Sequence, residues 1–470
     1  MRSVRTHSLI RTALLAALST FAPTLALANA VTAQPISADP SAGPVADHDR
    51  AKDPTKLETD DHRLAHPKLR DYLLGVPRAL LLPLGLVELG LGAIGKSALE
   101  CDQKHHVADQ LRAAVTSADG KVGIRPAFEY QQDFHPTAGL QYFYGRLWHG
   151  TKITVSTQIG TKNNLLSTGH INIPILEHRL FLDLDGKYRK RDDELYTGIG
   201  MATTTPYARY GVDQGDASVK FTVKFRQILK IDVSTAYGAR SFNDGARYDG
   251  DAQINDVYCA HASTGPCRVP KVLDSAVPRF NEGTRFIRQH FGGHLDSRAS
   301  ELSAGNFFDI NVDYTQGVAG DPSRYLRVYG RAGTALALWK HRVIYFSVRA
   351  SDETSFDGST IPFSELSTLG GSNDLRGFRV GRFRERSMLM ATLEYRWPVW
   401  TWLDGALFAD YGGVYGALFK GVDLKTLRPD VGFAFIAHAD DKVIIRIQFA
   451  YGFGFGGGSR FMLNGPDNPS

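Results

Sequence analysis

The feature that most constrains this chain is an alternation of apolar and polar residues that begins near Lys121 and continues almost to the end. Four stretches show it clearly: 152–159 (KITVSTQI), 219–226 (VKFTVKFR), 308–314 (FDINVDY) and 443–449 (VIIRIQF). A period of two places successive side chains on opposite faces of a β-strand. One face is apolar, while the other carries charges of both signs, which fits lipid outside and water inside. The pattern predicts an all-β fold, a transmembrane antiparallel β-barrel.

About sixteen strands follow from this alternation, and their connections differ between the two ends of the barrel. The predicted strands are 121–131, 137–147, 150–161, 164–174, 178–189, 215–226, 229–241, 284–295, 305–316, 323–335, 338–350, 386–398, 404–415, 429–438, 442–453 and 458–464. Tight turns alternate with the long connections 190–214, 242–283, 351–385 and 416–428. Outer-membrane barrels have short periplasmic turns and long external loops, so we expect the long connections at the cell surface.

The overall composition looks like that of a soluble protein, with 43% hydrophobic residues and a mean hydropathy of −0.21. A barrel explains this value, because only every second strand residue faces lipid. The formal net charge of +5 gives no reason to expect nucleic acid as a partner. Three of the 54 basic residues, and none of the acids, lie in the first thirty residues, and no basic run is interleaved with aromatic residues.

The first thirty residues have the features of a secretory signal peptide. Arg2, Arg5 and Arg11 accompany an apolar stretch, 12–22, and residues 28–30 (ANA) have the small-x-small form of a cleavage site. A membrane anchor is the alternative, but the apolar stretch is too short to span a bilayer. We therefore expect a cleaved signal peptide at 1–30 and export to the bacterial outer membrane.

Two segments of different character precede the barrel. Residues 31–68 are rich in Ala, Pro, Asp and His without apolar periodicity, which predicts a disordered linker. Residues 69–118 carry a dense apolar band and then a more polar helical pattern, which predicts periplasmic or interfacial helices. A spanning helix is the alternative, and Pro83 and Glu88 disfavour it. The barrel is then expected at 119–465, with a short tail at 466–470.

The three cysteines indicate a disulfide rather than a metal centre. Cys259 and Cys267 lie eight residues apart in a stretch rich in Gly, Pro and Ser, so an exported chain could close a small disulfide loop there. Two reduced thiols are the alternative. Cys101 has no evident partner, and only His261 lies near the pair as a further ligand. We therefore predict no metal site and no cofactor.

A glycine-rich segment, 370–378 (GGSNDLRGF), carries a single arginine, Arg376. Strand parity predicts that Glu394 and Asp410, on the two strands that follow, both face the lumen. A loop folded into the lumen could set Arg376 against Asp410, with Glu394 nearby, as a partly desolvated charge pair. Gly377 would let the backbone turn tightly behind the arginine. The alternative is an exposed arginine on a free surface loop.

These segments resemble the BamA/TamA-like outer-membrane assembly family, also called the bacterial surface antigen family. The residues that carry the resemblance are Arg376, Gly377 and Phe378 (an arginine-glycine-aromatic loop motif), Glu394 (the acid of the next strand), and Phe408, Asp410 and Gly412 (an aromatic-x-Asp-x-Gly strand). The resemblance covers 119–465 and is most specific over 369–412. It implies a sixteen-strand barrel with five strands after the loop, which the predicted strands also have.

The chain departs from that family before the barrel. Family members usually carry periplasmic polypeptide-transport-associated domains there, whereas residues 31–118 show only a linker and a helical pattern. The sequence therefore predicts a short member without these domains. Substrate capture by such domains is not carried over.

A run of glycines marks the junction of the last strand with the first. Gly454, Gly456, Gly457 and Gly458 crowd the start of the last predicted strand. Glycines weaken a strand, so the seam between the last and first strands is predicted to be the weakest ladder of the barrel. In the resembled family this seam opens sideways into the membrane. The alternative is that the glycines only form an external turn.

The resemblance implies a function in outer-membrane biogenesis, by insertion or translocation of proteins, or by local perturbation of lipid, at the seam. The expected partners are outer-membrane lipids, together with nascent outer-membrane proteins or a periplasmic protein; no oligomeric state follows from the sequence. A passive pore or structural barrel is the alternative. A lipid hydrolase is less favoured, because no Gly-x-Ser-x-Gly motif is present and neither His170 nor His341 has an evident serine and acid. We therefore expect no enzymatic activity.

Overall fold

The computed structural model describes residues 115–464, apart from 118, 131, 177–178, 202–206, 227, 259–274 and 440–441. The predicted signal peptide, linker and tail lie outside these residues, as do Cys101, Cys259 and Cys267, so the predicted disulfide stays a prediction. Of the predicted helical segment, only 115–117 are described. Within the described part of the chain, no helix is both long enough and apolar enough to cross a membrane.

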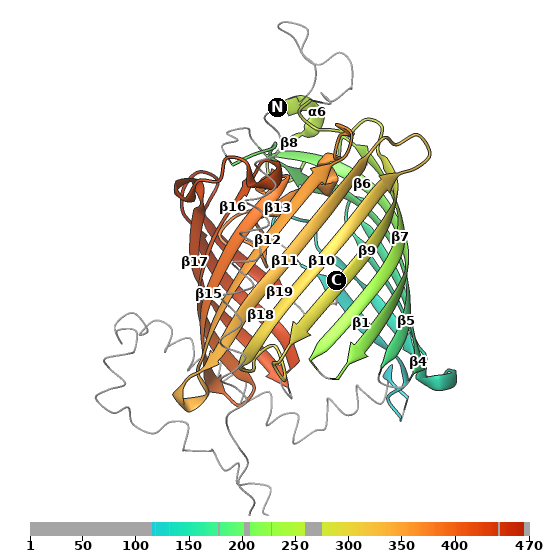
Figure 1. Cartoon of the computed structure of the whole chain (residues 1–470), viewed down its shortest axis with the longest axis vertical. Coiled ribbons are helices and arrows are strands. Elements are labelled where there is room, and N and C mark those ends of the chain that lie inside the picture. The colour runs from blue at the N-terminus through green and yellow to red at the C-terminus, as the bar shows by residue number, and fades with distance from the viewer. Residues whose placement is uncertain are drawn as a thin grey trace, which may run out of the picture. The chain divides into compact units, whose positions relative to one another are not determined.

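The described strands form one antiparallel meander, in which each strand of the wall pairs with the next (Figure 1). Its first half comprises β1 (Val122–Glu129), β2 (Thr137–Tyr144), β3 (Lys152–Gly160), β4 (Leu165–Leu176), β5 (Leu180–Tyr196), β6 (Ala208–Phe225), β7 (Leu229–Asn243) and β9 (Thr284–Asp296). Its second half comprises β10 (Gly305–Gly317), β11 (Arg324–Ala337), β12 (Val343–Ser355), β15 (Ser387–Trp400), β16 (Leu403–Tyr415), β17 (Arg428–Ala439), β18 (Lys442–Gly452) and β19 (Ser459–Asn464).

Short elements lie in the connections. The strand β8 (Ala252–Gln253) pairs in parallel with β6, and β13 (Ser367–Leu369) pairs with β14 (Phe383–Glu385). The helical turns are α6 (Ile254–Tyr258), η2 (Trp148–Gly150), η3 (Trp339–His341), η4 (Phe363–Glu365), η5 (Ala417–Phe419) and η6 (Leu424–Thr426). We call residues 356–386, between β12 and β15, the inner loop. The barrel end that carries this loop is the loop end, and the opposite end is the turn end.

The predicted fold class, a transmembrane antiparallel β-barrel of about sixteen strands, is confirmed, and every predicted strand overlaps one strand of the wall. The predicted loop 190–214 is wrong in its extent. Both flanking strands continue into it, because β5 runs to Tyr196 and β6 starts at Ala208, and these two residues pair directly. The charged run in this region is not a solvated loop, since Arg191 Nε donates to Asp193 Oδ1 at 2.8 Å and both side chains are buried.

The two faces of the wall have opposite character, as the alternation requires. On β15 and β16, Leu393 and Tyr411 point outward and are 52% and 42% exposed in the isolated chain. Glu394 and Asp410 point inward and are 2% and 1% exposed. An outward apolar face is what lipid contact selects, so the buried polar positions identify the side that faces the lumen.

The inner loop packs inside the barrel as part of its core. One apolar cluster, Leu369, Leu375, Phe378, Phe383, Met388, Met390 and Val414, combines loop residues with residues of β15 and β16. A second cluster at the loop end, Tyr196, Ala208, Tyr210, Val212, Ile254, Tyr258, Val277, Phe280 and Phe363, includes one more loop residue. Because burial of apolar area is the main favourable term in folding, the loop is held along its length and not only at its tip.

Candidate functional site

Arg376, near the tip of the inner loop, is enclosed by side chains from three strands of the wall. Its Nε and Nη2 donate to the two carboxylate oxygens of Asp410 at 2.7 and 3.0 Å. Its Nη1 donates to Glu394 Oε2 at 3.2 Å and to Gln448 Oε1 at 3.1 Å. The guanidinium also lies 3.3 Å from the centre of the Phe408 ring. A bidentate pair buried in this way is far less screened by water and salt than a surface pair.

The charge of this pocket is balanced by further residues. Glu394 accepts a second hydrogen bond from Arg396 Nε at 2.5 Å, and Arg446 lies 4.0 Å from its other oxygen. Burial alone would lower the pKa of Arg376, but the charge of Asp410 and its hydrogen bonds outweigh burial and raise it, so the guanidinium stays charged. The pocket is therefore a closed network of acids and arginines, in which each charge depends on its partners.

The backbone beside Arg376 is bound as closely as its side chain. Gly377 N donates to Asp430 Oδ2 at 2.9 Å, and Asp430 has no exposed surface. A Cβ added at Gly377 would lie 2.2 Å from the backbone nitrogen of Gly452, so only glycine fits there. On β16, a Cβ at Gly412 would lie 3.3 Å from a methyl group of Leu369 in the loop. Glycine at these positions allows the loop to pack closely against the strands.

Phe378 anchors the loop by burial. Its side chain is 1% exposed and its ring lies 5.1 Å from that of Phe383, edge to face. Its backbone forms an isolated antiparallel bridge with Gly457, in the turn between β18 and β19. The structure thus brings together all six residues that the sequence assigned to the lumen latch: Arg376, Gly377, Phe378, Glu394, Asp410 and Gly412.

The four seam glycines lie in the turn between β18 and β19, and they precede β19 rather than weaken its interior. This turn touches the inner loop, since Gly458 N donates to Gly377 O at 3.3 Å. Gly456 has a φ of 79°, and an added Cβ would lie 2.2 Å from Arg382 Nε. The glycines therefore form a turn, as in the alternative interpretation of the sequence, and they also support the loop.

Replacing Gly456 with Ala should weaken the contact between the β18–β19 turn and the inner loop. The substitution adds left-handed backbone strain of about 1–2 kcal/mol and pushes against the buried guanidinium of Arg382. Gly421→Ala is the matched control, because Gly421 has a φ of 83° and nothing within 4 Å of an added Cβ. We expect a lower urea midpoint for the Gly456 variant than for the control. Equal midpoints would mean that the contact with Arg382 contributes nothing.

The other arm of the inner loop carries a second buried anchor, Glu365. Its carboxylate is paired with Arg240 Nε at 3.2 Å and with Arg288, and it accepts from the Tyr325 hydroxyl at 3.1 Å. Arg327 donates to its backbone carbonyl. Burial alone would raise the pKa of Glu365, but the charges of Arg240, Arg288 and Arg327 outweigh it and lower the pKa to about 2. The loop therefore presents an acid to β7, β9 and β11 and an arginine to β15, β16 and β18.

Among the described residues, side chains of the turn after β1 contact β19 at the loop end. Gln132, in the turn after β1, accepts through Oε1 from the backbone nitrogen of Phe461 on β19 at 2.8 Å. Arg460 Nη1 donates to Asp133 Oδ1 at 3.2 Å. In the described ranges β1 is paired with β2 and β19 with β18, and no backbone ladder joins β1 to β19.

At the turn end, the chain that precedes β1 folds back along it. Thr116 forms an antiparallel bridge with Gly123, and Ser117 N donates to Val122 O at 2.7 Å. These bonds use the edge of β1 that faces away from β2 and toward the seam. The turn is stabilised by Asp119, which accepts from both Nε and Nη2 of Arg146 at 3.1 Å. Part of the free edge of β1 is therefore already covered by its own chain.

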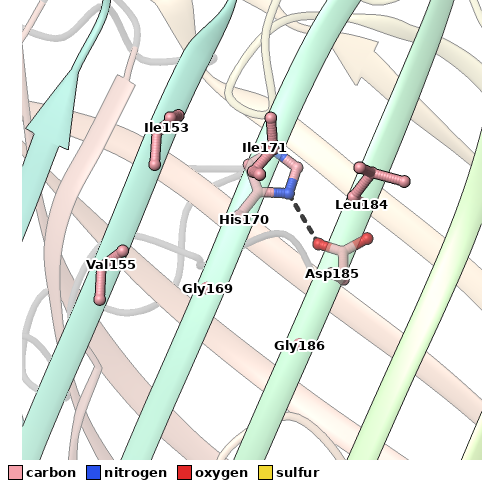
Figure 2. A pocket seen from close by; sticks show the side chains of 8 residues that line it. All are labelled: Ile153, Val155, Gly169, His170, Ile171, Leu184, Asp185 and Gly186. Atoms are coloured by element: carbon pink, nitrogen blue, oxygen red, sulfur yellow. Dashed lines mark hydrogen bonds and ion pairs between the residues drawn. The ribbon is translucent and has the colours of Figure 1, made fainter.

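The histidines singled out from the sequence are placed apart from this site. His170 on β4 and Asp185 on β5 point toward one another, with Nδ1 and Oδ1 2.7 Å apart (Figure 2). Ser218 contacts the other oxygen of Asp185 at 3.5 Å, so histidine and serine meet the acid separately, unlike the arrangement of a hydrolytic triad. His341 lies in the turn η3. In the part of the chain described, no group of three or more metal-ligating side chains is arranged to hold an ion.

Several residues of the site were not predicted from the sequence. Gln448 and Asp430 lie at inward positions of β18 and β17, and the alternation did place Gln448 on the polar face. Nothing in the sequence linked either residue to Arg376, because the barrel must close before they meet. Glu365 and Asp133 lie in connections, where no periodicity reports the direction of a side chain.

A comparison with known protein families agrees with the β-barrel fold described above. The model of the Omp85 superfamily domain matches residues 146–420, which is more than half of the chain. The chain belongs to the Omp85 superfamily. Its barrel is accordingly an outer-membrane barrel, and at the level of the family its function is in outer-membrane protein biogenesis or translocation. A comparison with curated proteins gives no match.

Two solved structures illustrate the likeness of this Omp85 barrel. BamA from Haemophilus ducreyi, lacking POTRA domains 1–3, is 15% identical, with 73% of this chain and 69% of that chain covered and a TM-score of 0.55. CdiB from Acinetobacter baumannii is 10% identical, with 70% of this chain and 55% of that chain covered and a TM-score of 0.43. The likeness to BamA shows a shared fold.

Proposed function

We propose that this Omp85 protein inserts or translocates proteins at the outer membrane through the seam between β1 and β19. The observation that carries the proposal is a contrast within one barrel. The inner loop is fixed by buried ion pairs, whereas the seam is held by side-chain contacts such as that of Gln132 with Phe461. An edge strand without a partner presents free backbone groups, to which a client strand can pair.

The lengths of the strands support a second effect, on lipid. Counted over the described residues, β1 has 8 residues and β19 has 6, whereas β5 and β6 have 17 and 18. A tilted strand needs about 9–11 residues to cross the hydrocarbon core. Short strands at the seam would thin the bilayer locally, since lipid adapts to a hydrophobic span that is too short. Thin and strained lipid beside an open edge lowers the barrier for a client to enter.

The proposal is tested by locking the seam. In a variant whose three native cysteines are replaced by Ser, cysteines at Gln132 and Phe461 would be joined with a short bis-maleimide. Locked barrels in proteoliposomes should no longer assemble an added outer-membrane barrel protein. Assembly is measured on gels from the heat-modifiability of that added protein. The matched control joins cysteines at Ala332 and Val348, which are paired within the continuous β11–β12 ladder.

Two results would contradict the proposal. Full client assembly by the seam-locked barrel would show that the seam does not open. A strain depleted of the protein that keeps normal levels of other outer-membrane proteins would favour a passive pore or structural barrel. Ion conductance that persists after locking would add to the case for the pore.

We also propose, from the separate placement of His170 and Ser218, that the protein is not an enzyme.

A further inference from the structure

A three-way ion contact joins the inner loop to both sides of the seam. Asp133, in the turn after β1, forms ion pairs with two arginines that come from different elements. Arg460 of β19 reaches both of its oxygens, with Nη1 3.2 Å from Oδ1, and Arg379 of the inner loop places Nε 3.1 Å from the same oxygen. The three side chains are 6%, 11% and 13% exposed, so water screens the contact only weakly.

Asp133 is held in position by the wall beneath it. Arg209, which has no exposed surface, donates through Nη1 to the backbone oxygens of Asp133 and Asp193, both at 2.7 Å. Asp193 Oδ2 in turn accepts from His135 N at 2.6 Å, in the same turn after β1. The turn is therefore fixed to β5 and β6, and it cannot follow Arg460 if β19 moves away.

Arg379 is also bound on the β1 side of the seam. Its Nη1 and Nη2 donate to the two oxygens of Asp251 at 3.2 Å, and its guanidinium lies 4.3 Å from the centre of the Tyr207 ring. Asp251 is paired in turn with Arg209. Only two residues separate Arg379 from Arg376, which is bound to β15, β16 and β18. The tip of the inner loop thus crosses the seam on the lumen side. Arg376 is bound on the β18 side of the seam, and Arg379 is bound on the β1 side.

We propose that Asp133 couples the docking of the inner loop to the closure of the seam. The inference rests on the proposed function only in that the seam opens during work. Moving the loop out of the lumen withdraws Arg379 from Asp133, and the carboxylate then keeps a single cation. Parting β19 from the turn after β1 withdraws Arg460 in the same way. Once either arginine leaves, water reaches this dry contact and screens the ion pair that remains, so each movement makes the other easier.

The test uses two readouts that do not involve a client. Maleimide labelling of a cysteine at Leu375, which has no exposed surface when the loop is docked, reports loop release. Cross-linking between cysteines at Gln132 and Phe461 reports seam closure. Both are measured in barrels without the three native cysteines, and only on the folded, heat-modifiable species.

Each decisive variant changes either the inner loop or the seam, and its effect is measured on the other of the two. Arg379→Gln, a loop change, should lower seam cross-linking, and Arg460→Gln, a strand change, should raise labelling at residue 375. We expect about fivefold in each case, which corresponds to about 1 kcal/mol. Asp133→Asn should shift both readouts. Arg460→Lys, which keeps the charge, should restore most of the loop protection.

The control is Arg247→Gln, which removes an exposed ion pair with Asp256 at the same barrel end and should change neither readout. If Arg379→Gln frees the loop while seam cross-linking stays at its original level, the coupling is wrong. That result would leave the proposed function standing, because client assembly is measured separately. Conversely, coupled readouts in a barrel that inserts no client would overturn the function and keep the coupling.

Discussion

Replacing Arg376 with Ala should destabilise the folded barrel by about 3–5 kcal/mol, the usual cost of removing one partner from a buried ion pair. The variant leaves Asp410 without the bidentate partner that lies 2.7 Å away, and it removes one of the cations beside Glu394. It also removes the cation over the Phe408 ring. Urea midpoints in detergent and the temperature at which heat-modifiability is lost both measure the change.

The comparison needs an arginine whose removal should matter little. Arg324→Ala serves, because its pair with Asp357 is exposed and surface pairs contribute little. Arg376→Lys is the second control: it keeps the charge but loses the two-pronged geometry, so its midpoint should fall between the parent and Arg376→Ala. If Arg376→Ala unfolded at the same urea concentration as Arg324→Ala, the arginine would not be a latch.

The strands were predictable because one physical cause, lipid outside and water inside, acts on every residue of the wall. Alternation alone placed Glu394 and Asp410 on the inner face, and the glycine-rich loop supplied a cation for them. The same rule failed where the wall extends beyond the apolar band. In 189–196 (RKRDDELY) both faces carry charges, so the end of β5 looked like a loop. Its charges are satisfied by one another, as in the pair of Arg191 with Asp193.

The parts of the site that lie in connections were not predictable in this way. Glu365 meets Arg240, Arg288 and Arg327 only because the inner loop re-enters the barrel, and its partners lie 38 to 125 positions earlier in the chain. Asp133 meets Arg460 only because the first and last strands become neighbours. Both contacts depend on the assembled tertiary structure, which no local pattern encodes.

Replacing Glu365 with Ala should destabilise the docked loop by an amount similar to that for Arg376→Ala, about 3–5 kcal/mol. The substitution leaves Arg240 and Arg288 facing one another without their shared acid. Because the pKa of Glu365 is lowered to about 2, its contribution is present at pH values above the ordinary range of a glutamate. That contribution is lost as the pH falls through about 2. The parent and the variant should therefore differ in urea midpoint at pH 7 and converge near pH 2.

The double variant, Arg376→Ala with Glu365→Ala, decides whether the two anchors act as one. Their side chains share no partner, so independent anchors would give losses that add. If the loop docks as a unit, the first substitution already releases it, and the second then removes contacts that no longer form. We expect the combined loss to exceed the larger single loss only slightly. Additive losses would mean that each arm of the loop docks alone, and that the tip can leave the seam while Glu365 stays bound.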